Sequence, residues 1–197
     1  MTEDAIEVRP LTRDRWQDVR RLFGPSGAYA NCWCTWWRQS GAEFGRGIEK
    51  SGRGNRALLH SLTEAGSEPG LMAYRGDDPI GWISVGPRTE YGRVLRSPML
   101  RPSPEEAAGD TSAWSVVCFW LPRGERRHGV GTALLAAAVQ HARDRGARTL
   151  EGYPIDTAGG RRAPAGIFTG TLAMFERAGF TEVARRRRER PIVRLTL

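Results

Sequence analysis

The sequence predicts an α/β protein built around a mixed sheet, and three patterns indicate this class. Residues 6–11 alternate apolar and polar side chains, as a half-buried strand does. Apolar runs at 70–74 and 80–85 flank the turn-forming Asp77-Asp78-Pro79, which is typical of an antiparallel hairpin. A buried-strand pattern at 114–121 precedes an amphipathic helix and another strand, which predicts a βαβ crossover. A hairpin and a crossover in one chain predict a sheet that is not wholly parallel.

The helices are indicated by apolar periodicity and by signals at their ends. Thr12 offers an N-cap to a first helix that ends at Gly24-Pro25. Its apolar face carries Trp16, Val19, Leu22 and Phe23. Residues 41–54, rich in Gly and Arg, are expected to be irregular before a helical pattern resumes over 55–65. The remaining elements are expected in this order: a helix at 130–145, a strand at 149–153, a helix at 171–178, and strands at 181–187 and 191–196.

Length and composition favour one domain over residues 1–197. Apolar residues make up 40% of the chain and charged residues 26%, and its apolar runs are far shorter than the roughly 20 residues that span a bilayer. The acidic start, Met1 to Asp4, lacks the basic and apolar regions of a secretory signal, so we expect a cytoplasmic protein. The net charge of +8 attracts anions of every kind, so it does not separate nucleic acid from a phosphorylated cofactor.

The three cysteines are expected to be free thiols. An odd number in a chain of this size argues against a disulfide framework. Cys32 and Cys34 are separated by one residue, whereas structural zinc sites use C-x₂₋₄-C with a second pair, which this sequence lacks. We therefore expect no bound metal and interpret these thiols and the neighbouring tryptophans as a hydrophobic cluster.

The most informative stretch is residues 126–132, RRHGVGT, between a buried-strand pattern and the start of a strong helix. The first turn of a helix leaves its backbone N–H groups without partners and carries a partial positive charge. Gly129 and Gly131 remove side chains that would keep a diphosphate away from these groups. The spacing matches neither a P-loop nor a dinucleotide fingerprint. The stretch therefore predicts a site for a pyrophosphate.

This stretch lies within residues 119–144, which resemble the coenzyme A motif of the GNAT acetyltransferases, and residues 175–180, FERAGF, resemble the helix-to-strand signature of that family. The resemblance implies a twisted, mixed, mostly antiparallel sheet of about six or seven strands flanked by helices. It also implies acetyl coenzyme A as co-substrate, with the pantetheine arm bonded to the edge of the strand before the motif. The implied cofactor contacts are Phe119 and Leu121 on that edge, and Arg126, Arg127, His128, Gly129, Val130, Gly131 and Thr132 around the pyrophosphate.

Catalysis by such a protein requires proton removal from an ammonium and proton donation to a thiolate. Many family members have a tyrosine that acts as general acid four residues before the Gly-Phe pair. This chain has Phe175 at that position, and it has Phe168 where an asparagine is often seen. Tyr153 is our candidate acid, because a phenol pKa of about 10 suits a thiol leaving group. For the base, Glu151, Asp156 and a water relay stay open, and Glu151 is equally compatible with a solvent-facing strand position.

The resemblance also places the acceptor amine, near Trp82, Ser84, Tyr153 and the loop after Asp156. Trp36 and Trp37 lie, with Trp33, in the segment that joins the first two helices, and aromatic walls of this kind bind flat or aliphatic substrates. The alternative for these tryptophans is packing in the hydrophobic cluster.

We therefore expect an N-acetyltransferase that moves an acetyl group from acetyl coenzyme A to a primary amine of a small molecule or peptide within a ternary complex. A non-catalytic acyl coenzyme A sensor stays open because the usual tyrosine is absent. The run from Arg185 to Arg188 suggests a nucleic-acid-binding protein, although alternation along a strand would split these charges between two faces and favours a solvated hairpin. No membrane partner is expected, and the sequence leaves a homodimer open.

Overall fold

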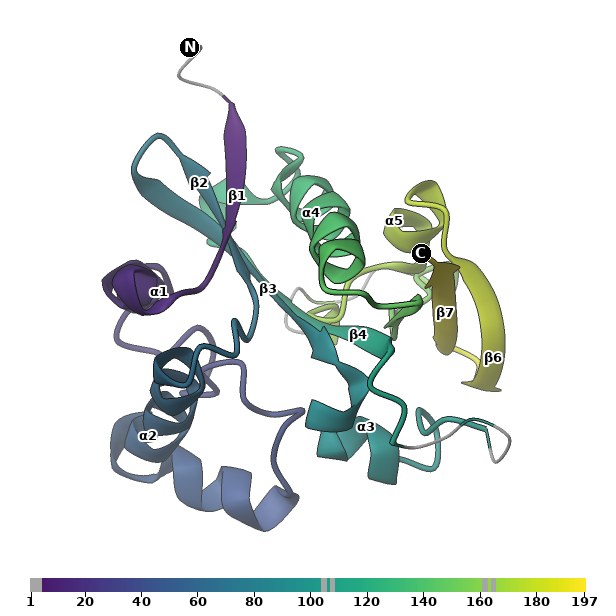
Figure 1. Cartoon of the computed structure of the whole chain (residues 1–197), viewed down its shortest axis with the longest axis horizontal. Helices are drawn as coiled ribbons and strands as arrows, with labels where there is room; N and C mark the ends of the chain where they lie inside the picture. Colours follow the sequence, from purple (N-terminus) through teal and green to yellow (C-terminus); the bar gives the residue numbers. More distant parts are fainter. Residues whose placement is uncertain (1–4, 104–105, 107–108, 161–162, 164–165) are drawn as a thin grey trace.

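An open seven-stranded sheet runs through the described part of the chain in the order β1-β2-β3-β4-β5-β7-β6 (Figure 1). The computed structural model describes residues 5–103, 106, 109–160, 163 and 166–197. The strands are β1 (Ile6–Pro10), β2 (Leu71–Arg75), β3 (Asp78–Pro87), β4 (Ala113–Trp120), β5 (Thr149–Gly152), β6 (Thr181–Arg187) and β7 (Arg190–Thr196). Neighbours pair antiparallel except β4 and β5, which are parallel. The predicted mixed, mostly antiparallel sheet is confirmed.

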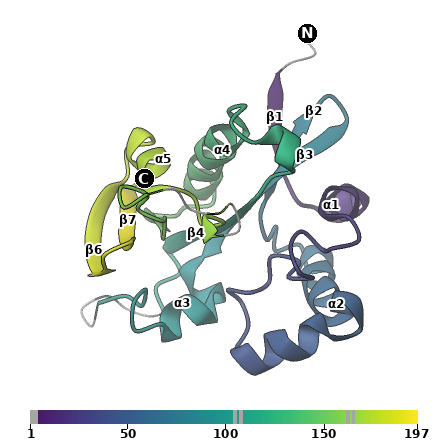
Figure 2. The ribbon, with the colours of Figure 1, turned by 180° about the vertical axis from the view of Figure 1, so that it is seen from behind.

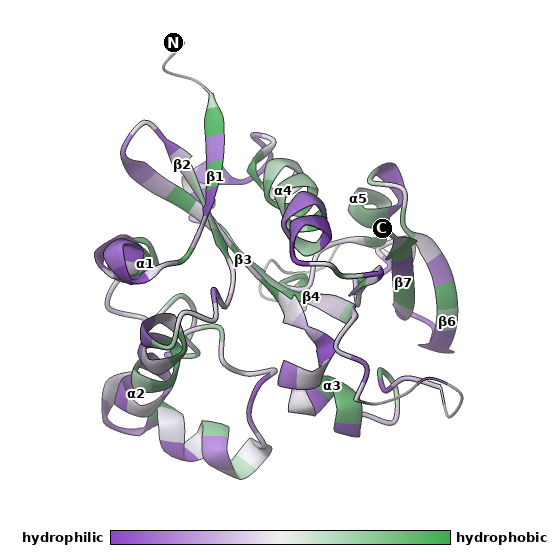
Figure 3. Ribbon diagram, viewed as in Figure 1, coloured by the Kyte–Doolittle hydropathy of each residue, from purple (hydrophilic) through white to green (hydrophobic). Residues whose placement is uncertain are grey.

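Helices cover both faces of this sheet. They are α1 (Trp16–Phe23), α2 (Gly41–Glu64), α3 (Gly92–Arg96), α4 (Val130–Asp144) and α5 (Leu172–Arg177). Consecutive residues of β2 show the two faces: Met72 is buried in the cluster that holds α1 and α2, and Ala73 in the cluster that holds α4 and α5. We call these faces the α1 face and the α4 face. Figure 3 shows hydrophobic colour where β3 meets β4 and hydrophilic colour on the outside of α1.

A bulge in β4 sets the geometry of the sheet centre. Ser84 of β3 pairs with Cys118 and Val85 with Val116, so Val117 is an extra residue in β4. Such a bulge bends its strand and increases the local twist. On the other edge, the parallel pairing of β4 with β5 ends where Val116 meets Gly152, although β4 continues to Trp120. The two parallel strands therefore part beyond this point.

The expectation of an irregular segment at 41–54 is wrong for most of its length. Helix α2 begins after Ser40, whose hydroxyl accepts from the Glu43 amide while the Glu43 carboxylate accepts from the Ser40 amide. This capping box overrides the low helix propensity of the glycines. Non-helical backbone is confined to residues 49–52, where Lys50, Ser51 and Gly52 have φ between 50° and 74°.

Two smaller expectations also change. Thr12 precedes a 3₁₀ turn at Arg13–Arg15 and makes no side-chain cap, so α1 begins at Trp16. Helix α3, which comes directly after Tyr91, was not expected. It has only five residues, and so short a helix leaves no periodic pattern in the sequence. Within the described residues, no helix combines the length and apolarity that crossing a membrane demands.

Candidate active site

The amino end of α4 is open to solvent and free of blocking side chains. Gly129 caps the helix in a left-handed conformation, φ 80° and ψ −11°, which glycine adopts without strain. A Cβ at Gly129 would meet nothing within 4 Å, and one at Gly131 would meet only the Met174 sulfur at 3.6 Å. The first helical bond joins the Ala133 amide to the Gly129 carbonyl at 3.0 Å, so the amides before Ala133 have no partner inside the helix.

Basic side chains surround this helix end. Arg126, Arg127 and His128 are exposed, and the Arg126 guanidinium donates to the Leu121 carbonyl at 3.2 Å. The loop is tied to β2 by a two-bond ion pair between Arg75 and Glu125, with distances of 2.9 and 3.1 Å. The structure thus brings together the residues that the sequence assigns to a pyrophosphate site, on a loop fixed at one side. These contacts leave the amides of the first helical turn available to an anion.

The gap between β4 and β5 is filled by the chain that precedes α5. The Phe119 amide, on the β4 edge facing this gap, donates to the Phe168 carbonyl at 2.6 Å. The Phe119 ring lies on the α4 face, edge to face with Phe175 at 6.2 Å. A Cβ at Gly152 would come within 2.2 Å of the Phe175 ring, so this ring packs directly on β5 at its last residue paired with β4. The edge that the family resemblance assigns to a pantetheine arm is therefore bonded, at Phe119, to residue 168 in this structure.

Tyr153 and Glu151, the candidate acid and base, are buried at this point of separation. The Tyr153 hydroxyl donates to Glu151 at 2.9 Å and lies 2.9 Å from the Ser115 hydroxyl of β4. Burial, followed by the nearby Glu151 charge, raises the pKa of Tyr153 well above its ordinary value. The phenol therefore keeps its proton at neutral pH, and its pKa lies further above that of a thiol than the expectation from the sequence assumed.

Two arginines hold the Glu151 carboxylate. Arg88 donates to it at 3.1 Å and Arg194 at 2.6 Å, and both also pair with Glu106. Glu151 is 2% exposed, so it is not the solvent-facing residue that its strand pattern allowed. Sequence reasoning missed the pairing of Arg88 and Arg194 with Glu151, because the two arginines lie 63 and 43 positions from Glu151 and carry no local motif.

The four candidate acceptor residues do not share one surface. Trp82 and Ser84 are buried in β3, and Trp37 is buried beside Phe168, with ring centroids 6.2 Å apart. Trp36 is exposed, with the Arg93 guanidinium 3.5 Å from its ring centroid. The indole N–H groups of Trp37 and Trp82 are buried and have no hydrogen-bond partner among the described residues. A buried donor without a partner costs about 1–3 kcal/mol.

The cysteines join the segment after α1 to the bulge of β4. The Cys34 sulfur lies 3.4 Å from that of Cys118, and all three cysteines are free thiols. The segment is strained, because five non-glycine residues between positions 28 and 34 have positive φ. No group of three or more metal-ligating side chains is arranged to hold a metal in the described ranges.

The family model described as Acetyltransferase (GNAT) family matches residues 33–158, well over half of the chain. The match spans the α4 helix end and the parting of β4 and β5. The protein belongs to the GNAT family of acetyltransferases. A comparison with curated proteins finds no match.

Solved structures agree with this fold. A GCN5-related N-acetyltransferase from Kribbella flavida has a TM-score of 0.55 and 15% identity, covering 100% of both chains. PaiA N-acetyltransferase from Thermoplasma acidophilum, solved with coenzyme A, gives 0.53 and 13%, covering 98% of this chain and 99% of that one. YncA, a putative acetyltransferase from Salmonella typhimurium solved with acetyl coenzyme A, gives 0.54 and 14%, covering 98% and 94%. At these identities the likeness concerns the fold alone.

Cys32 should be the first cysteine to react with iodoacetamide. A hydrogen bond with the Cys34 side chain, aided by backbone amides, lowers the pKa of Cys32 to about 6, whereas the pKa of the buried Cys34 is raised. The alkylation rate should rise with pH around a midpoint near 6, because the thiolate is the nucleophile. Quenched time points analysed by mass spectrometry give this rate, and Cys32→Ser should lose the fast phase. A fast phase that persists in Cys32→Ser would refute the assignment.

Proposed function

We propose that this protein is an N-acetyltransferase that moves an acetyl group from acetyl coenzyme A directly to a primary amine of a small molecule or peptide. The observation that carries the proposal is the open amino end of α4, placed by a glycine cap just past the central strand β4 in a chain of the GNAT family. A helix end with free amides and surrounding cations suits a diphosphate.

The cofactor assignment rests on two groups of residues. The amides of Val130, Gly131 and Thr132 would hold the pyrophosphate, with charge supplied by the side chains of residues 126–128. The edge of β4 at Phe119 and Leu121 would hold the arm. When bound, acetyl coenzyme A supplies an activated acetyl thioester. The helix end can accept the pyrophosphate as it stands. At Phe119, the backbone amide is bonded to the Phe168 carbonyl, and this bond must break before the amide can bind the arm.

The acceptor side is supported by the two unpaired indoles. Trp37 and Trp82 present buried N–H groups on the α1 face, where Ser84 also lies. A substrate oxygen or the acyl carbonyl would satisfy these donors. Trp36 stands apart from them on the surface, and we assign it a place at the rim of the acceptor site.

For proton transfer we assign Tyr153 as the donor to the departing thiolate. Its hydroxyl lies between Ser115 and Glu151 where β4 and β5 part. Arg88 and Arg194 fix the position of the Glu151 carboxylate. This carboxylate accepts a hydrogen bond from the Tyr153 hydroxyl and thereby orients the phenol. Removal of the ammonium proton would then fall to Glu151, to Asp156, which pairs with Arg185 at 2.8 Å, or to a water relay.

Release of thiol from acetyl coenzyme A across a panel of small amines and peptides is the direct test. We expect turnover with at least one primary amine and acetylated product by mass spectrometry. Cofactor binding without turnover on any amine would favour the sensor, in line with the internal bonding of Tyr153 and Glu151. Salt-sensitive retention on DNA without cofactor binding would favour the nucleic-acid-binding alternative.

Gly129→Glu should reduce coenzyme A affinity by about 100-fold or more, because it places a carboxylate beside the diphosphate site. Calorimetry of the folded variant measures the effect. Gly129→Gln is the matched control, since it has the same size and the same left-handed backbone strain without the charge, and it should lose less affinity. Unchanged affinity in Gly129→Glu would place the diphosphate elsewhere.

Tyr153→Phe should lower kcat by about 100-fold with little change in coenzyme A affinity, because general acid catalysis contributes about that much. Tyr74→Phe is the control: it removes a buried hydroxyl, bonded to Asp18 at 3.0 Å, from β2. Steady-state kinetics on both variants, with unfolding midpoints, separates chemistry from stability. Wild-type turnover in Tyr153→Phe would remove this residue from the mechanism.

A further inference from the structure

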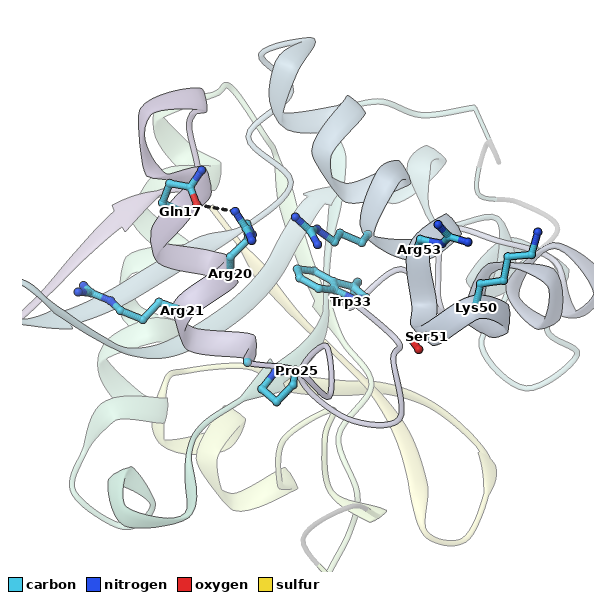
Figure 4. Close-up of a pocket in the computed structure, with 10 residues that line it drawn as sticks. Gln17, Arg20, Arg21, Pro25, Trp33, Lys50, Ser51 and Arg53 are labelled. Atoms are coloured by element: carbon cyan, nitrogen blue, oxygen red, sulfur yellow. Dashed lines mark hydrogen bonds between the residues drawn. The ribbon is translucent and has the colours of Figure 1, made fainter.

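A groove of about 920 Å³ lies between α1 and the break in α2, on the α1 face (Figure 4). Helix α1 contributes Arg20 and Arg21, and the chain around the break contributes Lys50, Arg53 and Arg56. Its lining in the described chain therefore contains five cationic side chains and no carboxylate. Figure 4 shows Trp33 between Arg20 and Arg53.

Most of these charges are uncompensated. Arg21 is the exception, since it lies 3.6 Å from the Asp18 carboxylate and donates to the Asp77 carbonyl. Arg20 donates to the neutral side-chain carbonyl of Gln17 at 2.7 Å. Among the residues described, no carboxylate forms an ion pair with Arg20, Lys50, Arg53 or Arg56. Like charges gathered in one groove repel each other and raise the local concentration of anions.

One wall of the groove is formed by a buried, well-packed tryptophan. Trp33 is 6% exposed, packs against Trp16 and Phe23, and has the Arg56 guanidinium 5.6 Å from its ring centroid. The left-handed residues 50–52 turn the chain at the break, so that Lys50 and Arg53 line the groove opposite α1. The cations thus come from two elements that face each other across a space the size of a small-molecule pocket.

The size and the position of the groove favour a small ligand over a long polyanion. The other cationic run, Arg185 to Arg188, lies on the last residues of β6 and in the turn after it, at the end of the molecule away from α1 and α2 (Figures 1 and 2). A nucleic acid would require a continuous basic track, whereas these two basic regions are separated by the sheet. Guanidinium forks on both walls match the paired oxygens of phosphate or carboxylate groups.

We propose that this groove is a second anion site, which binds a small polyanion carrying several phosphate or carboxylate groups. It is separate from the amino end of α4, because α4 covers the opposite face of the sheet. The groove binds its ligand whether or not the protein transfers acetyl groups.

Calorimetry with inorganic tripolyphosphate and with citrate, at low salt, tests the site. The protein should carry Gly129→Glu in every titration, so that binding at the α4 end does not contribute. We expect one-to-one binding of at least one probe, weakened at least about tenfold by the double variant Arg20→Ser and Arg53→Ser, since each removes a charge-assisted contact. Absence of binding by both probes overturns the proposal.

The matched control is Arg143→Ser with Arg177→Ser, which removes the same charge from exposed positions on α4 and α5. It should change the affinity less than twofold. Equal weakening in both double variants would show a general charge effect and overturn the proposal. A single-stranded RNA that binds more tightly than either probe, and loses affinity in the groove variant, would replace the small polyanion with nucleic acid. Unfolding midpoints confirm that all variants are folded.

Discussion

The sheet centre depends on β4 having different partners along its two edges. On one edge it pairs with β3 through a bulge at Val117, and on the other it pairs in parallel with β5 only as far as Val116. The bulge turns Val117 and Cys118 to the α1 face and leaves Phe119 on the α4 face. Both hydrophobic layers, the cysteine contact and the position of Tyr153 follow from this one strand.

Most of the fold could be predicted because its signals are local. The strand at 113–120, the glycine cap and the helix from Val130 to Asp144 follow one another directly in the sequence, so each supports the interpretation of the next. The helix stops at Gly146 and Gly179 adopt the positive φ that glycine permits. Residues 126–132 are contiguous, so their position at the open helix end follows from these local signals.

The parts that sequence reasoning missed depend on contacts distant in the chain or on competing local effects. The Ser40–Glu43 capping box outweighs four glycines in the first half of α2, and the composition alone pointed to a loop. The arginines around Glu151 come from β7 and the turn after β3, so no spacing rule finds them. The strained backbone at Trp33 and Cys34 is held by tertiary packing and leaves no compositional signature.

The Phe119 amide on the β4 edge is already bonded to the Phe168 carbonyl, so any ligand that needs this amide must displace residue 168. A molecule that takes this amide competes with the protein's own backbone, so its measured affinity equals its intrinsic affinity reduced by the fraction of chains in which residue 168 has withdrawn. Substitutions near Phe168 that never touch a ligand would therefore shift apparent affinity in either direction. The Phe168 ring also packs against Trp37, with centroids 6.2 Å apart, so withdrawal of residue 168 would remove this contact with the segment after α1 as well.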